Sequence, residues 1–266
     1  MSTVICLTHD VDSVRRPLAH VLSRRARFRL RDLLAHVFGL TNLYDNFKLI
    51  MEVEESLGVR STWFIPCFLF PIEDIEDYVR ELVRGGWEVG LHVVVEPVQT
   101  RGLLSMQKEF FKEYLSLTPV GARIHGLKAT PQIMEHLTAL GFRYDSSLRF
   151  EECGREKPFR VTLKLWELPL HLMDADIFGR LKLGERSAWR YITWKLDKLA
   201  KSGVEPIVVL FHQESFRMRG GRLYARLLEW IKERGWKTYT CAKYLEERCG
   251  LKRLESLSSV QERRDA

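Results

Sequence analysis

Short apolar runs and longer amphipathic stretches alternate along the chain. Runs rich in β-branched and aromatic residues predict strands, and apolar residues spaced three and four apart predict helices. The expected strands cover residues 4–7, 60–65, 87–91, 120–124, 142–144, 206–211 and 236–240. The expected helices cover residues 47–57, 74–83, 103–115, 130–141, 189–199, 223–233 and 243–247, and residues 160–172 are expected to be extended.

The repeated strand-then-helix order predicts a parallel sheet with right-handed crossovers. Roughly seven such units fit into the 266 residues, and α/β barrels typically run to about 250 residues. We therefore expect an α/β fold, a (β/α)7-like barrel of mostly parallel strands, in a single domain at residues 1–250. A helical, arginine-rich insertion is expected at residues 13–45 and a polar tail at residues 251–266.

Positive charge is concentrated near the N-terminus of this chain, whose formal net charge is +7. No acidic residue interrupts a run of arginines: Arg15, Arg16, Arg24, Arg25, Arg27, Arg29 and Arg31. The run is typical either of a surface for nucleic acid or an anionic substrate, or of a solvated helix face. We favour the solvated helix, because no base-stacking aromatic residues interleave with the arginines, and do not expect nucleic acid as a partner. The end of the run and the residues after it carry apolar side chains at helical spacing, which supports this helix: Leu30, Leu33, Leu34, Val37 and Phe38.

Composition and targeting features indicate a cytoplasmic globular protein. Apolar residues make up 45% of the chain and charged residues 29%, which is ordinary for a globular domain. The five cysteines form no C-x-x-C pair, so we interpret them as small core residues. The first residues lead straight into a strand, and no apolar run approaches membrane-spanning length. We expect no leader segment and no membrane partner.

The stretch Thr8-His9-Asp10-Val11-Asp12 carries the densest candidate chemistry. On a strand, the side chains of Asp10 and Asp12 point to the same face. Two carboxylates so placed repel each other unless a cation or a proton separates them. The stretch therefore predicts a metal site with an adjacent base, and the alternative is that these residues cap a turn before a helix.

Other reactive side chains also follow expected strands. They are His92, Arg123, His125, Asp145 and His212. In a parallel barrel this placement brings them to one mouth, where the active sites of such barrels are built. A lone histidine after a strand is usually a loop residue, but several histidines converging with two aspartates favour an active site.

Five short motifs follow one another between roughly residues 3 and 247. They read T-H-D-V-D, V-G-L-H, R-I-H-G-L-K, Y-D-S-S-L and V-V-L-F-H. Together they resemble the ordered motifs of the polysaccharide deacetylase family, which are metal-dependent amidohydrolases on a distorted barrel. The resemblance implies hydrolysis of a non-peptide C–N (amide) bond, in an N-acylated sugar or a related small molecule.

The resemblance also implies a role for each matching residue. Asp10 corresponds to the general base, Arg123 to the residue that holds this base, and His212 to the general acid. Asp12 and His92 correspond to ligands of a divalent metal, which we expect to be zinc.

The chain departs from the family pattern at one metal ligand. A second histidine usually follows the first within a few residues, but this chain reads His92-Val93-Val94-Val95-Glu96. Either Glu96 or His125 takes its place, since zinc accepts a carboxylate or an imidazole. We favour His125, because the R-x-H-x-L wording resembles a divergent branch of the family that opens with T-H-D-V-D.

Some predicted roles have simpler alternatives. Asp145 is expected to bind substrate or orient His212, but Asp-Ser-Ser is equally an ordinary turn. Trp166 and Trp189 are candidates to line a sugar groove, and core packing is the alternative for both. Two other functions stay open: an inactive relative that binds carbohydrate without metal, and nucleic-acid binding through the arginine-rich insertion.

Overall fold

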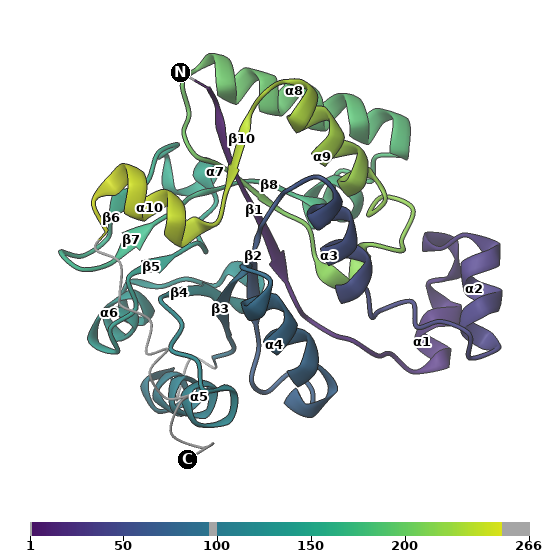
Figure 1. Cartoon of the computed structure of the whole chain (residues 1–266), viewed down its shortest axis with the longest axis horizontal. Coiled ribbons are helices and arrows are strands. Elements are labelled where there is room, and N and C mark those ends of the chain that lie inside the picture. The colour runs from purple at the N-terminus through teal and green to yellow at the C-terminus, as the bar shows by residue number, and fades with distance from the viewer. Residues whose placement is uncertain (1, 96–99, 252–266) are drawn as a thin grey trace.

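A single ten-stranded sheet forms the centre of the protein and curls into a barrel (Figure 1). The computed structural model describes residues 2–95 and 100–251. The strands are β1 (Val4–Asp10), β2 (Thr62–Ile65), β3 (Glu88–Val93), β4 (Gly121–Ile124), β5 (Tyr144–Asp145), β6 (Phe159–Arg160), β7 (Trp166–Glu167), β8 (Leu170–Met173), β9 (Ile207–Leu210) and β10 (Lys237–Tyr239). Of the expected polar tail, only Leu251 lies within the described residues.

The order of the strands shows how the sheet closes. Neighbouring strands follow the order β6-β7-β5-β4-β3-β2-β1-β9-β8, and β10 pairs with the first half of β1. Every pair is parallel except the β6–β7 hairpin. Strand β8 lies near the other half of the sheet, because only Leu168 and Pro169 separate it from β7 and the Leu170 N–H donates to the Leu148 carbonyl, just after β5, at 2.8 Å. The predicted single-domain, distorted α/β barrel of mostly parallel strands is therefore confirmed.

Helices surround the sheet (Figure 1). The α-helices are α1 (Leu18–Ser23), α2 (Leu30–Val37), α3 (Phe47–Ser56), α4 (Glu76–Arg84), α5 (Thr100–Leu115), α6 (Pro131–Ala139), α7 (Phe150–Cys153), α8 (Glu185–Lys201), α9 (Leu223–Glu233) and α10 (Cys241–Cys249). Shorter 3-10 turns lie at Arg25–Arg27, Ile72–Asp74, His125–Leu127 and Gln213–Ser215, and a π-helix at Ala175–Arg180. Helix α6 begins as predicted, with Pro131 first and Thr130 Oγ1 accepting from the Ile133 N–H at 3.3 Å. None of the helices in the described ranges is long and apolar enough to cross a membrane.

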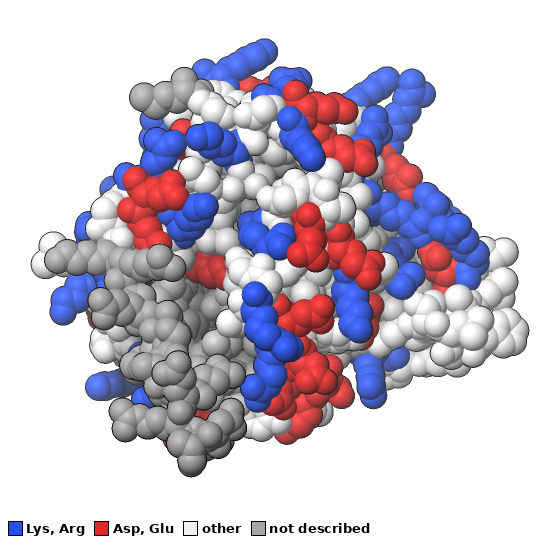
Figure 2. Space-filling view, viewed as in Figure 1, with Lys and Arg blue, Asp and Glu red and all other residues white. Residues whose placement is uncertain are grey.

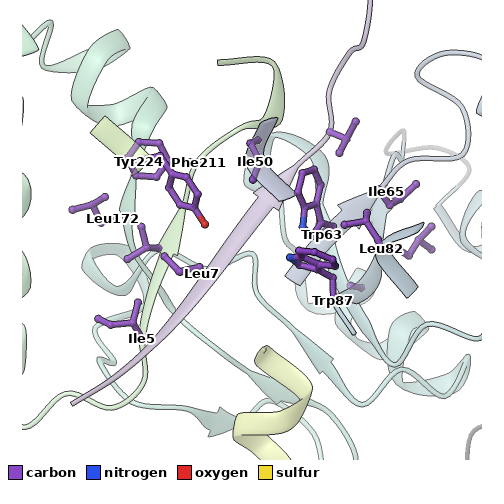
Figure 3. Close-up of a cluster of buried hydrophobic side chains, with 14 of the residues drawn as sticks. Ile5, Leu7, Ile50, Trp63, Ile65, Leu82, Trp87, Leu172, Phe211 and Tyr224 are labelled. Carbon is purple, nitrogen blue, oxygen red and sulfur yellow. The ribbon is translucent and has the colours of Figure 1, made fainter. Parts of the chain in front are cut away.

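Strand β1 divides its side chains between the two faces of the sheet. Ile5 and Leu7 point outward and pack with Trp63, Phe211 and other residues of the main core (Figure 3). Val4 and Cys6 belong to a second buried cluster with residues such as Phe64 and Val208. Because side chains alternate along a strand, Thr8 and Asp10 continue the face of Val4 and Cys6. The apolar start of the strand thus fixes which way its polar end points.

His9 lies on the outward face of β1 and contacts neighbouring helices. Its Nε2 atom is 3.1 Å from both Glu54 Oε1 on α3 and the Tyr224 hydroxyl on α9. Its Nδ1–H donates to the Phe211 carbonyl at 2.8 Å. His9 therefore ties β1 to the helical layer and points away from its neighbour Asp10.

Residues 13–45, called the lobe below, project from one side of the barrel (Figure 1). Helices α1 and α2 lie where a helical insertion was expected. The apolar stripe of α2 mostly faces solvent: Leu30 is 70% exposed and Phe38, just after the helix, is 73% exposed. Asp32 is buried instead and pairs with Arg222. The lobe thus turns an acidic residue inward and leaves large apolar side chains outside.

Candidate metal centre and catalytic residues

The carboxyl ends of neighbouring parallel strands bring most of the predicted residues to one mouth of the barrel. These residues lie at or just after the ends of β1, β3, β4 and β9: Asp10, Asp12, His92, Arg123, His125 and His212. Strand β8 adds Asp174, which follows its last residue. The ends of parallel strands share one edge of a barrel, so residues far apart in sequence become neighbours.

Asp12, His92 and His125 form a compact cluster. His92 Nε2 lies 3.1 Å from Asp12 Oδ1 and 3.1 Å from His125 Nδ1, and His125 Nδ1 lies 3.2 Å from Asp12 Oδ1. A tetrahedral zinc ion with bonds near 2.0–2.2 Å would hold its ligand atoms about 3.3–3.6 Å apart, slightly farther than here. The separation and the residue types of this cluster fit a divalent metal. Of the two alternatives for the third ligand, Glu96 lies outside the described residues and His125 lies in the cluster.

The orientation of His92 also fits a metal ligand. Its Nδ1–H donates to the backbone carbonyl of Arg123 at 3.1 Å, which leaves a lone pair on Nε2, the atom facing Asp12 and His125. Second-shell hydrogen bonds of this kind commonly fix the tautomer of metal-binding histidines. A lone pair beside a carboxylate oxygen requires a cation or a shared proton between them.

Asp12 and His125 shift each other's pKa values. Burial disfavours the ionised Asp12, but hydrogen bonds with His125 and then His92 outweigh burial and lower the pKa of this carboxyl. The hydrogen bond to Asp12 likewise raises the pKa of His125. Asp12 thus favours positive charge at His125, and a divalent cation would compete with a proton for this position.

Asp10 and Arg123 form a buried pair next to this cluster. Arg123 is fully buried, and its Nη1 donates to Asp10 Oδ1 at 3.0 Å and to Thr8 Oγ1 at 2.8 Å. Its Nε donates to the Ser146 carbonyl and its Nη2 to the Ser146 hydroxyl. The guanidinium lies over the ring of Phe64, 4.4 Å from the ring centroid. These contacts fix the position of the Asp10 carboxylate inside the mouth of the barrel.

Asp174 holds His212 in place. Asp174 Oδ1 accepts a hydrogen bond from His212 Nδ1–H at 2.6 Å, and Oδ2 accepts from the His212 backbone N–H at 3.0 Å. The other ring nitrogen, Nε2, lies 3.9 Å from Asp12 Oδ2 and faces the cluster. Burial alone would lower the pKa of His212, but the charge and hydrogen bond of Asp174 reverse the effect and raise this pKa well above its usual value.

Asp145 does not orient His212 in the structure. It is fully buried, its Oδ2 accepts from the Ser147 hydroxyl at 2.9 Å, and its Oδ1 accepts from the Ser147 N–H at 3.0 Å. Burial raises the pKa of Asp145 to about 6, and the side chain interacts with the neighbouring acid Glu167. Asp145 therefore supports the turn after β5, in line with the alternative interpretation of Asp-Ser-Ser, and Asp174 is the residue in contact with His212.

The two candidate groove tryptophans lie away from the mouth. Trp166 borders a separate small cavity with Gly250 and Leu251, and the Arg160 guanidinium lies 4.5 Å from its ring centroid. Trp189 packs edge-on against Trp230 at a centroid distance of 6.3 Å. Core and surface packing thus accounts for both side chains.

A large cavity opens beside the candidate centre. It has a volume of about 1070 Å³, and Asp12, Asp174 and His212 form part of its wall. Ligand pockets of proteins usually measure about 300–1,000 Å³. The cavity therefore has room for a ligand larger than a single sugar.

Comparison with known proteins shows the fold. No family model matches the chain, and no curated protein matches it in sequence. A structure described as a polysaccharide deacetylase from Mycobacterium smegmatis is 21% identical and matches 96% of this chain and 95% of its own with a TM-score of 0.68. A structure from Pseudomonas aeruginosa PAO1 with the same description is 13% identical, with 94% and 93% of the chains covered and a TM-score of 0.68. Puue allantoinase is 15% identical, with 94% and 92% covered and a TM-score of 0.67. The chain has the fold of the polysaccharide deacetylases, as its motifs led us to expect.

Proposed function

We propose that this protein is a metal-dependent hydrolase of a non-peptide amide bond, which removes the acyl group of an N-acylated sugar or a related small molecule. One observation carries the proposal: Asp12, His92 and His125 place three metal-binding atoms 3.1–3.2 Å apart at the barrel mouth. The ordered motifs and the shared fold with polysaccharide deacetylases support the choice of reaction.

Asp12, His92 and His125 would hold the metal, and we expect zinc because two imidazoles and one carboxylate suit it. When bound, a zinc ion with three protein ligands supplies Lewis acidity and a water of lowered pKa. Asp12 and His125 contribute ligand atoms from loops just past β1 and β4, and His92 contributes one from within β3. The protein therefore draws its ligands from three separate segments of the barrel.

Asp10 acts as the general base in this proposal. Its carboxylate accepts the proton of the attacking water, and the fixed guanidinium of Arg123 holds the acceptor in place. Buried carboxylates lose much of their hydration, so the contact with Arg123 compensates for this loss. Arg123 is a positioning residue and does not exchange protons itself.

His212 acts as the general acid. The departing amine is a poor leaving group until its nitrogen is protonated, and the raised pKa of His212 favours the protonated imidazole that supplies this proton. Asp174 fixes the tautomer by accepting from Nδ1–H, so Nε2–H faces the cluster and can deliver the proton. Base and acid thus reach the reacting amide from different strands.

Two variants of neighbouring carboxylates test this assignment. We expect Asp12→Asn to lose zinc, because a charged ligand is removed, whereas Asp10→Asn should retain zinc and lose amide hydrolysis by about 10²–10⁴-fold. Zinc content after dialysis and acetate release from a panel of N-acetylated sugars measure the two effects. Asp77→Asn, the same change on the exposed side of α4, is the matched control and should alter neither.

Two results would count against the proposal. Zinc at wild-type stoichiometry in Asp12→Asn would reject the ligand assignment, and undiminished turnover in Asp10→Asn would reject the base. A wild-type protein that binds N-acetylated sugars but neither retains zinc nor releases acetate would instead be the inactive, carbohydrate-binding relative.

A further inference from the structure

The cavity beside the candidate centre has two chemically different walls. One wall contains Asp12, Asp174 and His212. Another part of the wall comes mainly from the lobe and carries the five cavity arginines: Arg16, Arg24, Arg27 and Arg29 of the lobe, and Arg219 from the loop before α9. Figure 2 shows Lys and Arg side chains gathered where the lobe meets the body of the protein. The arginine-rich run thus faces the same space as the predicted catalytic residues.

The five cavity arginines are not neutralised by acidic neighbours. Within residues 2–95 and 100–251, none of them forms a salt bridge. Other arginines of the run do pair, Arg15 with Asp74 and Arg31 with Asp32. The cavity also contains Glu185 and Glu214, but burial raises the pKa of Glu214 to about 7, which reduces its negative charge near neutral pH.

Polar groups without partners surround the same space. Tyr44 lines the cavity and is buried, and its hydroxyl has no hydrogen-bond partner among the described residues. The Oε2 atom of Glu214, another lining residue, is also buried without a partner in that part of the chain. His20 of the lobe also lines the cavity, and its pKa is lowered first by burial and then by the charges of Arg24, Arg16 and Arg27. The cavity combines excess positive charge with buried polar atoms that are available to a ligand.

We propose, on the basis of the function proposed above, that this cavity binds a phosphate-bearing part of the amide substrate, so that the N-acyl sugar is presented as a phosphate or diphosphate ester. Guanidinium groups donate paired hydrogen bonds that match the geometry of phosphate oxygens. At about 1070 Å³ the cavity accommodates both the sugar and the group esterified to it. The arginine-rich lobe is then part of the substrate site.

Phosphate of this kind has two possible sources, a soluble ester and a lipid-linked ester. The lobe that carries the arginines also exposes large apolar side chains, including Leu30, Phe38 and Leu40. Lipid chains would contact such side chains favourably, whereas a soluble ester would leave them in water. The test therefore includes one substrate from each source.

Binding to the metal-free protein tests the cavity without depending on turnover. The probes are N-acetylglucosamine, its 1-phosphate and its uridine diphosphate ester, each measured by calorimetry in EDTA. We expect at least one ester to bind about tenfold or more tightly than the neutral sugar, because charge-assisted contacts to phosphate are strong. In the lipid arm, vesicles with and without a polyprenyl diphosphate ester of N-acetylglucosamine are compared by co-sedimentation.

A matched pair of variants locates the contact. Arg24→Gln with Arg27→Gln should weaken binding of the preferred ester about tenfold or more and leave binding of the neutral sugar unchanged. Arg25→Gln is the control: it removes one arginine charge between these two positions, but Arg25 does not line the cavity and donates to the Leu22 carbonyl. Binding of the ester by Arg25→Gln should stay within about twofold of wild type.

The outcomes separate this proposal from the one on which it rests. Preference for a soluble ester, or for the lipid-linked ester alone, supports the phosphate site and identifies its source. Equal binding of esters and neutral sugar in both arms, or equal losses in the cavity double variant and in Arg25→Gln, would overturn it. If the zinc-loaded protein hydrolyses neutral N-acetyl sugars and these binding differences are absent, the hydrolase proposal holds and only the phosphate site fails. Preferential ester binding without any amide hydrolysis would instead support the phosphate site and reject the hydrolase proposal.

Discussion

Arginine side chains near the candidate site occupy two contrasting environments. Arg123, inside the barrel, is fully buried and donates to Thr8, Asp10 and Ser146. The five cavity arginines form no salt bridge within the described residues. Burying an unpaired cation costs several kcal/mol, so Arg123 requires its partners, whereas a cation at a cavity edge stays hydrated and can exchange water for a ligand. The contrast assigns Arg123 to the architecture of the site and the five cavity arginines to recognition.

Removing Arg123 should produce the largest change. Arg123→Met leaves the Asp10 carboxylate buried without its counter-charge, and breaking a buried pair in this way costs about 3–5 kcal/mol of the free energy of unfolding. Arg24→Met removes the same charge from the cavity edge and should change the free energy of unfolding by less than about 0.5 kcal/mol. Urea unfolding followed by circular dichroism measures both.

A third variant shows whether the Asp10 charge is the cause. If it is, Asp10→Asn combined with Arg123→Met should be more stable than Arg123→Met alone, because the unpaired charge is gone. Equal stabilities of Arg123→Met and Arg24→Met would mean that the two environments do not differ as described.

Asp174 provides the next largest effect, on catalysis rather than on stability. Without the Asp174 charge, burial dominates at His212 and lowers the pKa of the imidazole. His212 must be protonated to act as an acid, so activity is lost as the pH rises through its pKa. We expect Asp174→Asn to reduce kcat about 10²-fold or more and to move the alkaline limb of the pH profile to lower pH. Rates of acetate release measured from mildly acidic to alkaline pH follow both changes.

Asp176→Asn is the control for this effect. Asp176 follows two residues later and pairs with Arg149 and Arg180 rather than with a histidine. Its replacement should leave the alkaline limb in place. If Asp174→Asn lowers kcat but leaves the alkaline limb of the pH profile at the same pH, Asp174 has only a structural role.

The barrel was predictable because its pattern is local. Runs such as Ile207–Leu210 are apolar throughout, as a strand covered on both faces requires, and each is followed by an amphipathic helix. The lobe was predictable as helix but not in its orientation. The spacing of the apolar residues on α2 predicts an apolar face but not its direction. The ion pair of Asp32 with Arg222, far away in the sequence, turns the opposite face inward and leaves the apolar face in solvent.

The site was predictable where its residues end strands that have a clear apolar run. Asp10 and His212 follow such runs, whereas Asp174 follows β8, whose boundaries were obscured within the expected extended segment 160–172. Its position directly after β8 was the signal that could have identified it. The lobe arginines line the cavity because of how the lobe packs against the barrel. That packing depends on residues far apart in the sequence, so no local sequence pattern predicts it.

The smallest effect is expected on the outer surface of the lobe. Leu40 is 80% exposed and Leu43 is fully buried, although only three positions separate them. Leu40→Ala should change the free energy of unfolding by less than about 0.5 kcal/mol, and Leu43→Ala, its matched control, should cost about 2–5 kcal/mol through the cavity it leaves. Urea unfolding at two protein concentrations measures both. A loss of more than about 1 kcal/mol in Leu40→Ala that grows with protein concentration would show that a second copy of the chain covers the apolar side of the lobe. Leu40 would then stabilise an interface. The apolar residues of the lobe would be covered by a second copy of the chain, whereas those of the barrel are covered by its own helices.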